Sequence, residues 1–480
     1  MSTMRRLAMF VVAGSTVLAL LSGCGNGNFG PADADQENLA RTGQGDTVDP
    51  GSVTQTSASE NSQAQGTASG LPTVAIPSSA DPRSFPDSTK APEEGSPEWL
   101  INEILKLRVQ KGPATDDAEK LRAHRRWRNE KIIKLAQDAI AQTHQNPQQE
   151  RVFNVSVHHL MEARLQLALQ IDQKNLKTAH EEIDSLYGDA DALFQRDGKS
   201  QAAAEAAFVR AKFANINAQR FADREPKWLI EFSQQARLFA HNFEDQQNRA
   251  VALLDAAARS CELHRIREET LNCYSLLKQR FPNTPQGQQA TAILRRFALE
   301  GQRLEKFGGP TIDGGFVHLD EFQGHVVLLI FWSSDSKRFV RQLPHLTALT
   351  RKYRQAGLAV IGVCLDTETA AAEELLKKNS LYERVILWPE AERRRWNNPI
   401  VKYYGIRDIP TYWLIDRNGV VVDTLVDPTP KELRLASSSK SRKTRQDGLP
   451  NNPPVAAGLE KQLETLLKTD RPTGRRSNRE

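Results

Sequence analysis

The sequence predicts an α + α/β protein, in which an all-helical region over residues 96–300 precedes an α/β domain with a central mixed sheet over 305–470. Apolar residues at three- and four-residue spacing, with no strand pattern between them, indicate helices as far as Leu299. Two continuous apolar runs, 326–332 and 358–365, then indicate strands that are buried on both faces of a sheet. With 480 residues, the chain has room for two or three domains.

The N-terminal residues have the pattern of an export signal. Arg5 and Arg6 precede an apolar stretch over 7–21, which is shorter than the roughly 20 residues of a membrane-spanning helix and suits a signal peptide. Small residues before Cys24 resemble the bacterial lipoprotein signal, in which the cysteine is acylated and becomes the new N-terminus. We therefore expect a signal peptide over 1–23 and lipidation of Cys24, with an uncleaved signal anchor as the alternative. Either version exports the protein and anchors it to a membrane, facing the periplasm or the cell surface.

Three segments have the composition of disordered chain. Residues 24–95 are rich in Gly, Ser, Thr, Gln, Asp and Pro, and they bury too little apolar surface to offset their chain entropy. We interpret them as a stalk that holds the folded part away from the membrane. A basic insertion over 428–454 and a basic tail over 471–480 are either solvated or in contact with anionic lipid or another anionic envelope polymer.

The helical region is predicted to begin at Ser96, an N-cap residue followed by Pro97 at the first helical position. Its end, over 266–298, resembles a tetratricopeptide-type helical hairpin. An aromatic-proline pair beginning at Phe281 ends one helix, a polar turn follows, and the small residue Ala290 lies in the next helix. Because only one unit has this pattern, an irregular helical bundle is an equal alternative.

The helical region offers little chemistry. His158 and His159 are adjacent, so on a helix they point about 100° apart and cannot share a metal ion. We expect Cys261 and Cys273 to be buried free thiols, although a break between their helices would allow them to pair. No metal or cofactor site is predicted. A net charge of only +5 gives no reason to expect a nucleic-acid partner.

The α/β domain is predicted to alternate strands with helices. A turn of Arg417-Asn418-Gly419 indicates a hairpin near its end. The expected strands are 316–319, 326–332, 358–365, 384–388, 411–416 and 420–425, and the expected helices are 337–356, 369–378 and 456–467.

Residues from about 309 to 467 resemble the TlpA/redoxin branch of the thioredoxin superfamily, whose members are membrane-tethered thiol-disulfide oxidoreductases. Four motifs occur in the family's order. They are Gln323-Gly324-His325-Val326-Val327-Leu328-Leu329-Ile330-Phe331-Trp332, Leu343-Pro344-His345-Leu346, Val360-Ile361-Gly362-Val363-Cys364-Leu365-Asp366, and Tyr404-Gly405-Ile406-Arg407-Asp408-Ile409-Pro410-Thr411 with the hairpin that follows. The resemblance implies a thioredoxin-like fold with Pro410 in the cis form, and a backbone before Pro410 that pairs with an extended peptide.

The chain departs from this family at the reactive residues. Relatives carry Cys-x-x-Cys at the start of the helix after the Phe-Trp strand, where the helix N-terminus favours a thiolate. The two cysteine positions fall on Ser336 and Phe339, with Lys337 and Arg338 between them. Asp335 occupies a position where relatives often have tryptophan. The resemblance therefore implies a thioredoxin-like domain without its redox pair.

Other residues offer weak substitutes for the missing thiols. Cys364 lies in an apolar strand without a partner cysteine, which favours a buried, inert thiol. Ser336 would need a base to act as a hydrolytic nucleophile, and His345 follows it by nine residues. We assign no catalytic residue.

What remains is a groove beside the cis-proline loop. A helix N-terminus with two cations can receive an acidic group or a peptide, although a solvated, vestigial loop is an equal alternative. The candidate groove residues are Trp332, Asp335, Ser336, Lys337, Arg338, Ile409 and Pro410.

These observations predict a membrane-tethered envelope lipoprotein whose thioredoxin-like domain is redox-inactive and binds a protein or peptide partner. The alternative is a thiol-disulfide oxidoreductase of the TlpA/redoxin type that acts through a non-standard thiol such as Cys364.

Overall fold

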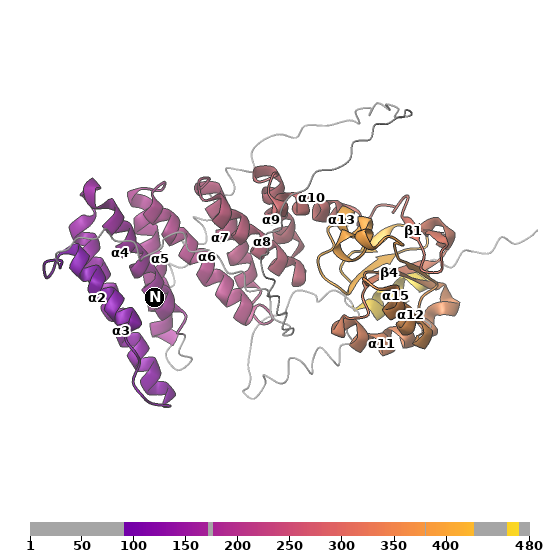
Figure 1. Ribbon diagram of the computed structural model, residues 1–480, viewed down its shortest axis with the longest axis horizontal. Coiled ribbons are helices and arrows are strands. Elements are labelled where there is room, and N and C mark those ends of the chain that lie inside the picture. The colour runs from indigo at the N-terminus through magenta and orange to yellow at the C-terminus, as the bar shows by residue number, and fades with distance from the viewer. Residues whose placement is uncertain (1–90, 171–175, 380, 427–457, 470–480) are drawn as a thin grey trace, which may run out of the picture. The chain divides into compact units, whose positions relative to one another are not determined.

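The computed structural model describes residues 91–170, 176–379, 381–426 and 458–469 (Figure 1). All of them belong to one compact unit, which spans residues 69–480. Within these ranges, no helix combines the length and the apolarity that crossing a bilayer requires. The predicted signal peptide, the insertion over 428–454, the basic tail and all but the last residues of the stalk lie outside the described residues, so these interpretations stay predictions.

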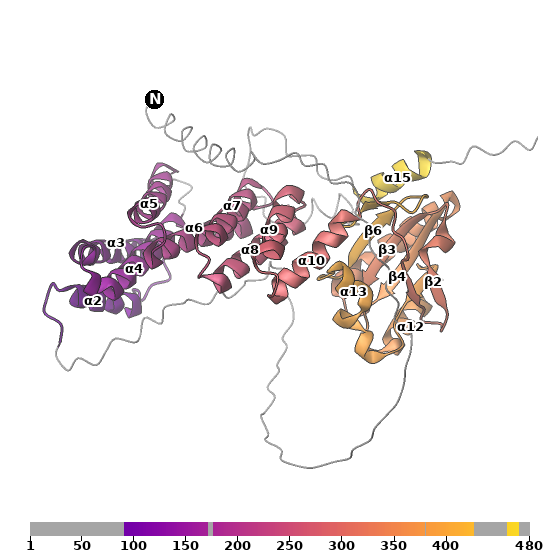
Figure 2. The same ribbon diagram turned by 90° about the horizontal axis from the view of Figure 1, so that it is seen from above.

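The first part of the described chain is helical, as the sequence predicts (Figures 1 and 2). Ser96 caps the first helix by accepting a hydrogen bond from the backbone N–H of Trp99, with Pro97 at the first helical position. The helices of this region are α2 (Pro97–Val109), α3 (Ala118–Thr143), α4 (Glu150–Ala168), α5 (Leu176–Arg196), α6 (Gln201–Phe221), α7 (Lys227–Asn242), α8 (Gln247–Leu263), α9 (Arg267–Arg280) and α10 (Pro285–Ala298).

A tight hairpin joins α9 to α10. Phe281 follows the last residue of α9, and Thr284 caps α10 by accepting from the N–H of Gly287 at 3.1 Å. A Cβ at Gly287 would overlap the carbonyl oxygen of Phe281, so only glycine allows this approach of the two backbones. The hairpin agrees with the predicted turn, whereas the tetratricopeptide resemblance stays a prediction.

The second part is an α/β domain that contains a five-stranded mixed sheet with the strand order β5-β4-β3-β6-β7. β3 pairs in parallel with β4 and antiparallel with β6, so it occupies the centre of the sheet. The strands of this sheet are β3 (Val326–Trp332), β4 (Leu358–Cys364), β5 (Arg384–Ile386), β6 (Thr411–Ile415) and β7 (Val421–Asp423). A separate two-stranded sheet consists of β1 (Gly308–Pro310) and β2 (Phe316–His318).

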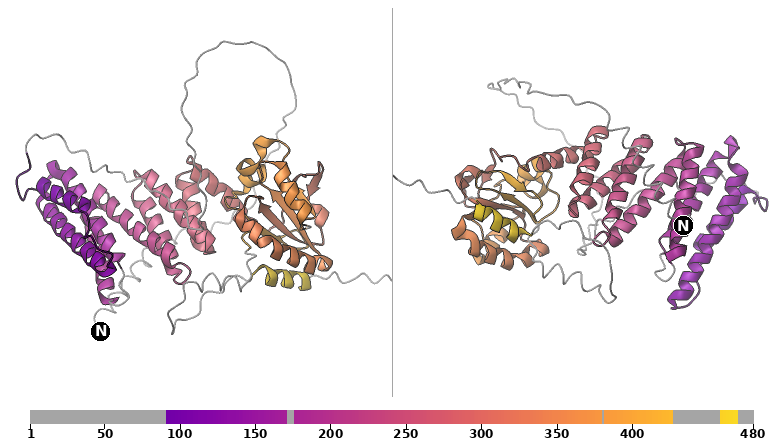
Figure 3. Two further views of the ribbon diagram at one scale, coloured as in Figure 1. Left: turned by 60° about the horizontal axis from the view of Figure 1, so that its bottom comes forward. Right: turned by 180° about the vertical axis from the view of Figure 1, so that it is seen from behind.

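Helices cover both faces of the sheet (Figure 3). On one face, α11 (Lys337–Tyr353), α12 (Thr369–Lys378) and α15 (Leu459–Thr469) contribute apolar side chains to a core with alternate residues of β3 and β4. On the other face, α13 (Pro399–Tyr404) packs over the remaining residues of the same strands. Both faces of β3 and β4 are therefore buried, which is why these strands have continuous apolar sequences. The predicted α + α/β fold class is confirmed.

Candidate functional site

The site is located where the C-terminal ends of β3 and β4 meet the segment that precedes β6. β3 ends at Trp332, which lies opposite Cys364 at the end of β4. Phe331 lies opposite Thr411, the first residue of β6, so the residue before Thr411 lies beside the end of β3. That residue is Pro410, and the Ile409–Pro410 peptide bond is cis, as the family resemblance implies. We call residues 333–336 the site loop and residues 405–410 the cis-proline loop.

Ser336, at the first family cysteine position, is the N-cap residue of α11. Its hydroxyl accepts a hydrogen bond from the backbone N–H of Phe339 at 3.3 Å. Its own backbone N–H donates to the carbonyl of Ser333 at 3.1 Å. Serine is a favoured residue for capping the free N–H groups of a helix start, so this hydroxyl has a local structural partner.

His345 does not act as a base for Ser336. Ser336 caps α11 and His345 lies within the same helix, so the nine-residue step between them corresponds to about 13 Å along the helix axis. The hydrolytic arrangement that the sequence left open is therefore not formed.

Phe339, at the second family cysteine position, is a core residue. Its side chain is fully buried and stacks on Trp332, with 5.3 Å between the ring centroids. The other side of Trp332 stacks on Tyr382 at 5.5 Å. Three aromatic rings therefore fill the space beneath the site loop. Trp332 is itself fully buried, so it supports the candidate groove from below and does not face a ligand.

Two carboxylates fix the site loop. The buried Asp366 accepts from the backbone N–H of Ser334 at 2.8 Å and also contacts the hydroxyl of Ser333. The same hydroxyl lies 2.5 Å from Oδ1 of Asp335, while Arg395 forms an ion pair with Oδ2 of Asp335. The hydrogen bond from Ser333, and next the guanidinium of Arg395, hold the pKa of Asp335 below its usual value. Both carboxylate oxygens of Asp335 therefore already have partners within the protein.

The remaining candidate residues are more accessible. Lys337 and Arg338 are exposed in the first turn of α11, and neither forms an ion pair with another described residue. Ile409 is half-buried, and within the described ranges its backbone N–H and C=O make no hydrogen bond. Pro410 is buried. Two exposed cations and the unbonded backbone groups of Ile409 therefore lie on the segments next to the C-terminal end of β3.

The described cysteines are all free and fully buried, as predicted for Cys261 and Cys273. Burial raises the pKa of Cys273 to about 11 and raises the pKa values of Cys261 and Cys364 further. Cys364 accepts a hydrogen bond from the backbone N–H of Asp366 at 3.5 Å, which lowers its pKa, but the effect of burial is larger. A thiolate is therefore disfavoured at all three positions near neutral pH.

The structure provides no evidence for a metal centre. In the part of the chain that it describes, no three His, Cys, Asp or Glu residues are grouped to hold a metal ion. His158 and His159 lie with their rings in an edge-on arrangement, and each contacts a different residue of the helical region: Glu205 for His158 and Arg108 for His159.

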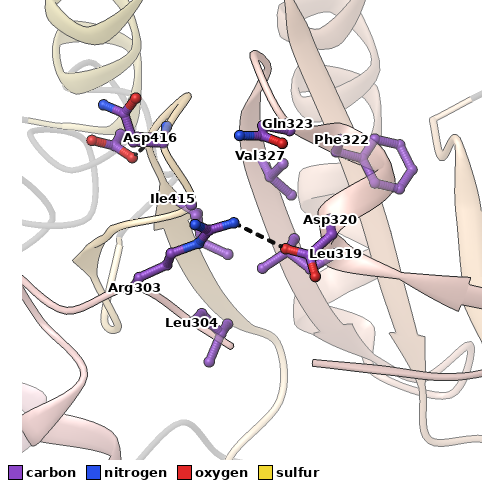
Figure 4. Close-up of a pocket in the computed structure, with 11 residues that line it drawn as sticks. Arg303, Leu304, Leu319, Asp320, Phe322, Gln323, Val327, Ile415 and Asp416 are labelled. Atoms are coloured by element: carbon purple, nitrogen blue, oxygen red, sulfur yellow. Dashed lines mark hydrogen bonds and ion pairs between the residues drawn. The ribbon is translucent and has the colours of Figure 1, made fainter. Parts of the chain in front are cut away.

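A small pocket lies at the opposite end of β3 (Figure 4). Its lining includes Val327, near the start of β3, and the strand partner Ile415, and also an ion pair of 3.3 Å between Arg303 and Asp320. Since the site loop follows the last residue of β3, this pocket is separate from the candidate site.

Sequence reasoning missed three residues at or near the site. Asp366 lay within a family motif but was not assigned a role, and Arg395 lies 60 residues from its partner Asp335. Arg407 was read only as part of the cis-proline motif, whereas its partners are in the helical region, more than 110 residues away. One available signal was Asn398-Pro399, an N-cap residue followed by proline, which marks the start of a helix. That helix is α13, which lies between Arg395 and Arg407 in the sequence.

The α/β domain is similar in sequence to known proteins. Residues 301–424 match the AhpC/TSA family. The thiol-disulfide oxidoreductase ResA of Bacillus thuringiensis subsp. konkukian is 27% identical over 132 residues, which are 28% of this chain and 72% of that protein. ResA of Halalkalibacterium halodurans is 24% identical over 128 residues, which are 27% of this chain and 69% of that protein.

A solved thiol-disulfide oxidoreductase of Bacteroides fragilis has 21% identity and a TM-score of 0.24, and the match covers 28% of this chain and 99% of that structure. The sequence matches concern only the last third of the chain. They and the cis-proline architecture lead to one conclusion: this chain carries at its C-terminal end a thioredoxin-like domain of the AhpC/TSA (redoxin) type, similar to ResA-type thiol-disulfide oxidoreductases.

Proposed function

We propose that this protein is an exported, membrane-tethered binding protein, whose thioredoxin-like domain holds an extended peptide of a partner protein without performing thiol-disulfide exchange. The observation that carries the proposal is the state of the two family cysteine positions. Ser336 caps α11, and Phe339 fills the core beneath the site loop. Neither side chain can supply an attacking or a resolving thiolate, which thiol-disulfide exchange requires.

The peptide-binding part of the proposal is supported by the cis-proline loop. An extended peptide adds to a fold by pairing with backbone groups that have no partner. The N–H and C=O of Ile409 have none among the described residues. Lys337 and Arg338 are exposed on the neighbouring helix start and favour a peptide with acidic side chains.

The membrane tether follows from the N-terminal sequence. Small residues before Cys24 suit lipidation, and the polar composition of residues 24–95 suits a stalk. In this arrangement the groove faces the cell envelope at a distance from the bilayer.

Thiol-disulfide exchange is the second candidate function, because the relatives of the C-terminal domain are named for it. It would have to proceed through Cys364, the only cysteine of this domain. That thiol is fully buried and its pKa is raised by burial, both of which oppose nucleophilic attack.

A displayed library of random peptides tests the binding proposal. The target is a protein comprising residues 69–480, which form one compact unit. We expect selected peptides to lose at least about tenfold in affinity to Ile409→Asp, since a loss of roughly 1.4 kcal/mol corresponds to a factor of ten. Phe316→Asp is the matched control, because Phe316 is an exposed apolar residue on the separate two-stranded sheet. Failure to select any peptide, or equal losses in both variants, would overturn the proposal.

A further inference from the structure

The cis-proline loop is attached to the helical region through Arg407. The side chain of Arg407 is only 10% exposed, so its charge requires partners. Its guanidinium lies 2.7 Å from the carboxylate of Asp255 in α8 and 3.3 Å from the side-chain oxygen of Gln289 in α10, and it also contacts the hydroxyl of Tyr274 in α9. Every polar side-chain partner of Arg407 that the described residues provide therefore comes from the helical region.

These partners are themselves connected. The hydroxyl of Tyr274 donates to Glu262 at 2.7 Å, and Glu262 lies 4.0 Å from Arg407. Arg296, whose side chain is 2% exposed, forms an ion pair with Glu262 and donates to the carbonyl of Gly405 at 3.5 Å. Buried charges stabilise a structure only when their partners are all in place. The network consequently favours one position of the loop relative to α8, α9 and α10.

The loop backbone also packs directly against α10. Gly405 has φ +61°, and a Cβ there would lie 2.7 Å from Cγ1 and 2.8 Å from the backbone nitrogen of Ile293. Glycine is thus required both for the left-handed backbone and for the close approach. The contact between the two parts of the chain does not depend on long surface side chains alone.

The helical region further reaches the border of the candidate groove. Arg259 in α8 lies 3.9 Å from the carboxylate of Asp408, which is 78% exposed and immediately precedes Ile409. Asp255, Arg259 and Glu262 are three or four residues apart and therefore share one face of α8. A peptide that paired with Ile409 would pass beside this face.

We propose that the helical region positions the cis-proline loop through Arg407 and forms one wall of the peptide groove through Arg259. Arg407 is a positioning residue in this arrangement, since it acts on the backbone of Ile409 and does not itself touch the peptide. The inference deepens the proposed function and rests on it for the peptide, whereas the attachment of the loop can be tested without any ligand. Binding at the groove and the integrity of the Arg407 network are then coupled.

Hydrogen exchange measures the attachment directly. In Arg407→Met, we expect the amides of Gly405 and Ile406, which both donate to the carbonyl of Val401, to exchange about tenfold faster or more. Arg417→Met is the matched control, because Arg417 donates to the carbonyls of Gly324 and Ala356 within the α/β domain only. Amides of β4 report global stability and are expected to remain unchanged.

Unchanged exchange of the Gly405 and Ile406 amides in Arg407→Met, or an equal increase in Arg417→Met, would overturn the proposal. If Arg407→Met does not fold, Asp255→Asn weakens the same contact from the helical side and is read in the same way. Arg407→Lys, which keeps the charge but not the planar fork of donors, is expected to restore part of the protection.

Peptide affinity supplies the second measurement. A peptide selected on the wild-type protein is expected to bind Arg407→Met and Arg259→Glu at least about tenfold more weakly, a loss of roughly 1.4 kcal/mol. Full affinity in both variants would refute the role of the helical region in the groove. If no peptide binds the wild-type protein, the proposed function fails, while the exchange data still decide whether the helical region positions the loop.

Discussion

Restoring two cysteines at positions 336 and 339 should convert this domain into a working thiol-disulfide oxidoreductase. The start of α11 and the cis Ile409–Pro410 peptide bond are in place, so we expect the missing thiols to be the main reason for inactivity. The variant is Ser336→Cys together with Phe339→Cys. Positions three apart in a helix have Cα atoms about 5 Å apart, which lies within the range that a disulfide spans.

The cost of this change can be worked from the structure. Removing a fully buried phenylalanine ring typically costs about 3–5 kcal/mol when alanine replaces it, and cysteine retains one heavy atom more than alanine. Because cysteine fills part of the space, we place the loss at about 2–4 kcal/mol even though the stacking of Phe339 on Trp332 is lost. Native proteins have about 5–15 kcal/mol of stability, so the variant should fold at 25 °C with a lower melting temperature.

The thiol at position 336 should be reactive. It would lie at the N-terminus of α11 and next to Lys337 and Arg338, and both the helix dipole and the cations favour a thiolate. The assay is dithiol-driven reduction of a protein disulfide, with the thiol pKa measured from the pH dependence of alkylation. We expect turnover above background and a pKa below the ordinary value of about 8.5.

A second cysteine pair provides the matched control. Ser200 is the N-cap residue of α6 and accepts from the backbone N–H of Ala203 at 3.2 Å, the same arrangement that Ser336 and Phe339 have. Ser200→Cys with Ala203→Cys therefore places an identical pair at a helix start without a cis-proline loop. Equal turnover in the two variants would show that any such dithiol suffices. A folded but inactive variant at 336 and 339 would refute the view that the groove is intact.

Three further outcomes are expected. In denaturant unfolding, Gly287→Ala should destabilise the protein by about 2 kcal/mol or more, because the added Cβ overlaps a carbonyl oxygen in the α9–α10 hairpin. The control Gly188→Ala within α5 places its Cβ in open space and should stabilise the protein by about 0.5–1 kcal/mol. Asp335 has a lowered pKa, so its contribution to stability is present above its unfolded-state pKa and is lost as the pH falls through its folded-state pKa. NMR titration should show a higher folded-state pKa of Asp335 in Arg395→Met, and an unchanged pKa would contradict the ion pair. Cys24→Ser should release the protein from membranes in cell fractionation, and continued membrane association would contradict lipidation.

The sequence predicted the parts of the fold that local patterns determine. The bounds of β3 and α12 agree with the predicted ranges 326–332 and 369–378, because a strand buried on both faces and a short amphipathic helix each have an unambiguous pattern. The strand over 384–388 is shorter than predicted, since the pairing of β5 with β4 ends at Ile386. Short elements such as β1 and α13 were missed because three to six residues carry too little periodicity.

The site was only partly predictable for a different reason. The loss of the cysteines could be read at Ser336 and Phe339, but the stacking of Phe339 on Trp332 depends on packing between a strand and a helix. The carboxylates that pair with Arg395 and Arg407, Asp335 and Asp255, lie 60 and 152 residues away in the sequence. Such pairs arise from the fold as a whole, so an arginine in a loop motif gives no indication of which carboxylate it meets.

The most direct test of the central claim is the redox activity of the wild-type protein. Dithiol-driven reduction of a protein disulfide should be measured for residues 69–480 and for the same protein with Cys364→Ser. Because Ser336 and Phe339 supply no thiol and Cys364 is buried with a raised pKa, we predict that both proteins leave the uncatalysed rate unchanged. Turnover by the wild-type protein that disappears in Cys364→Ser would contradict the account and establish an oxidoreductase that acts through a single buried thiol.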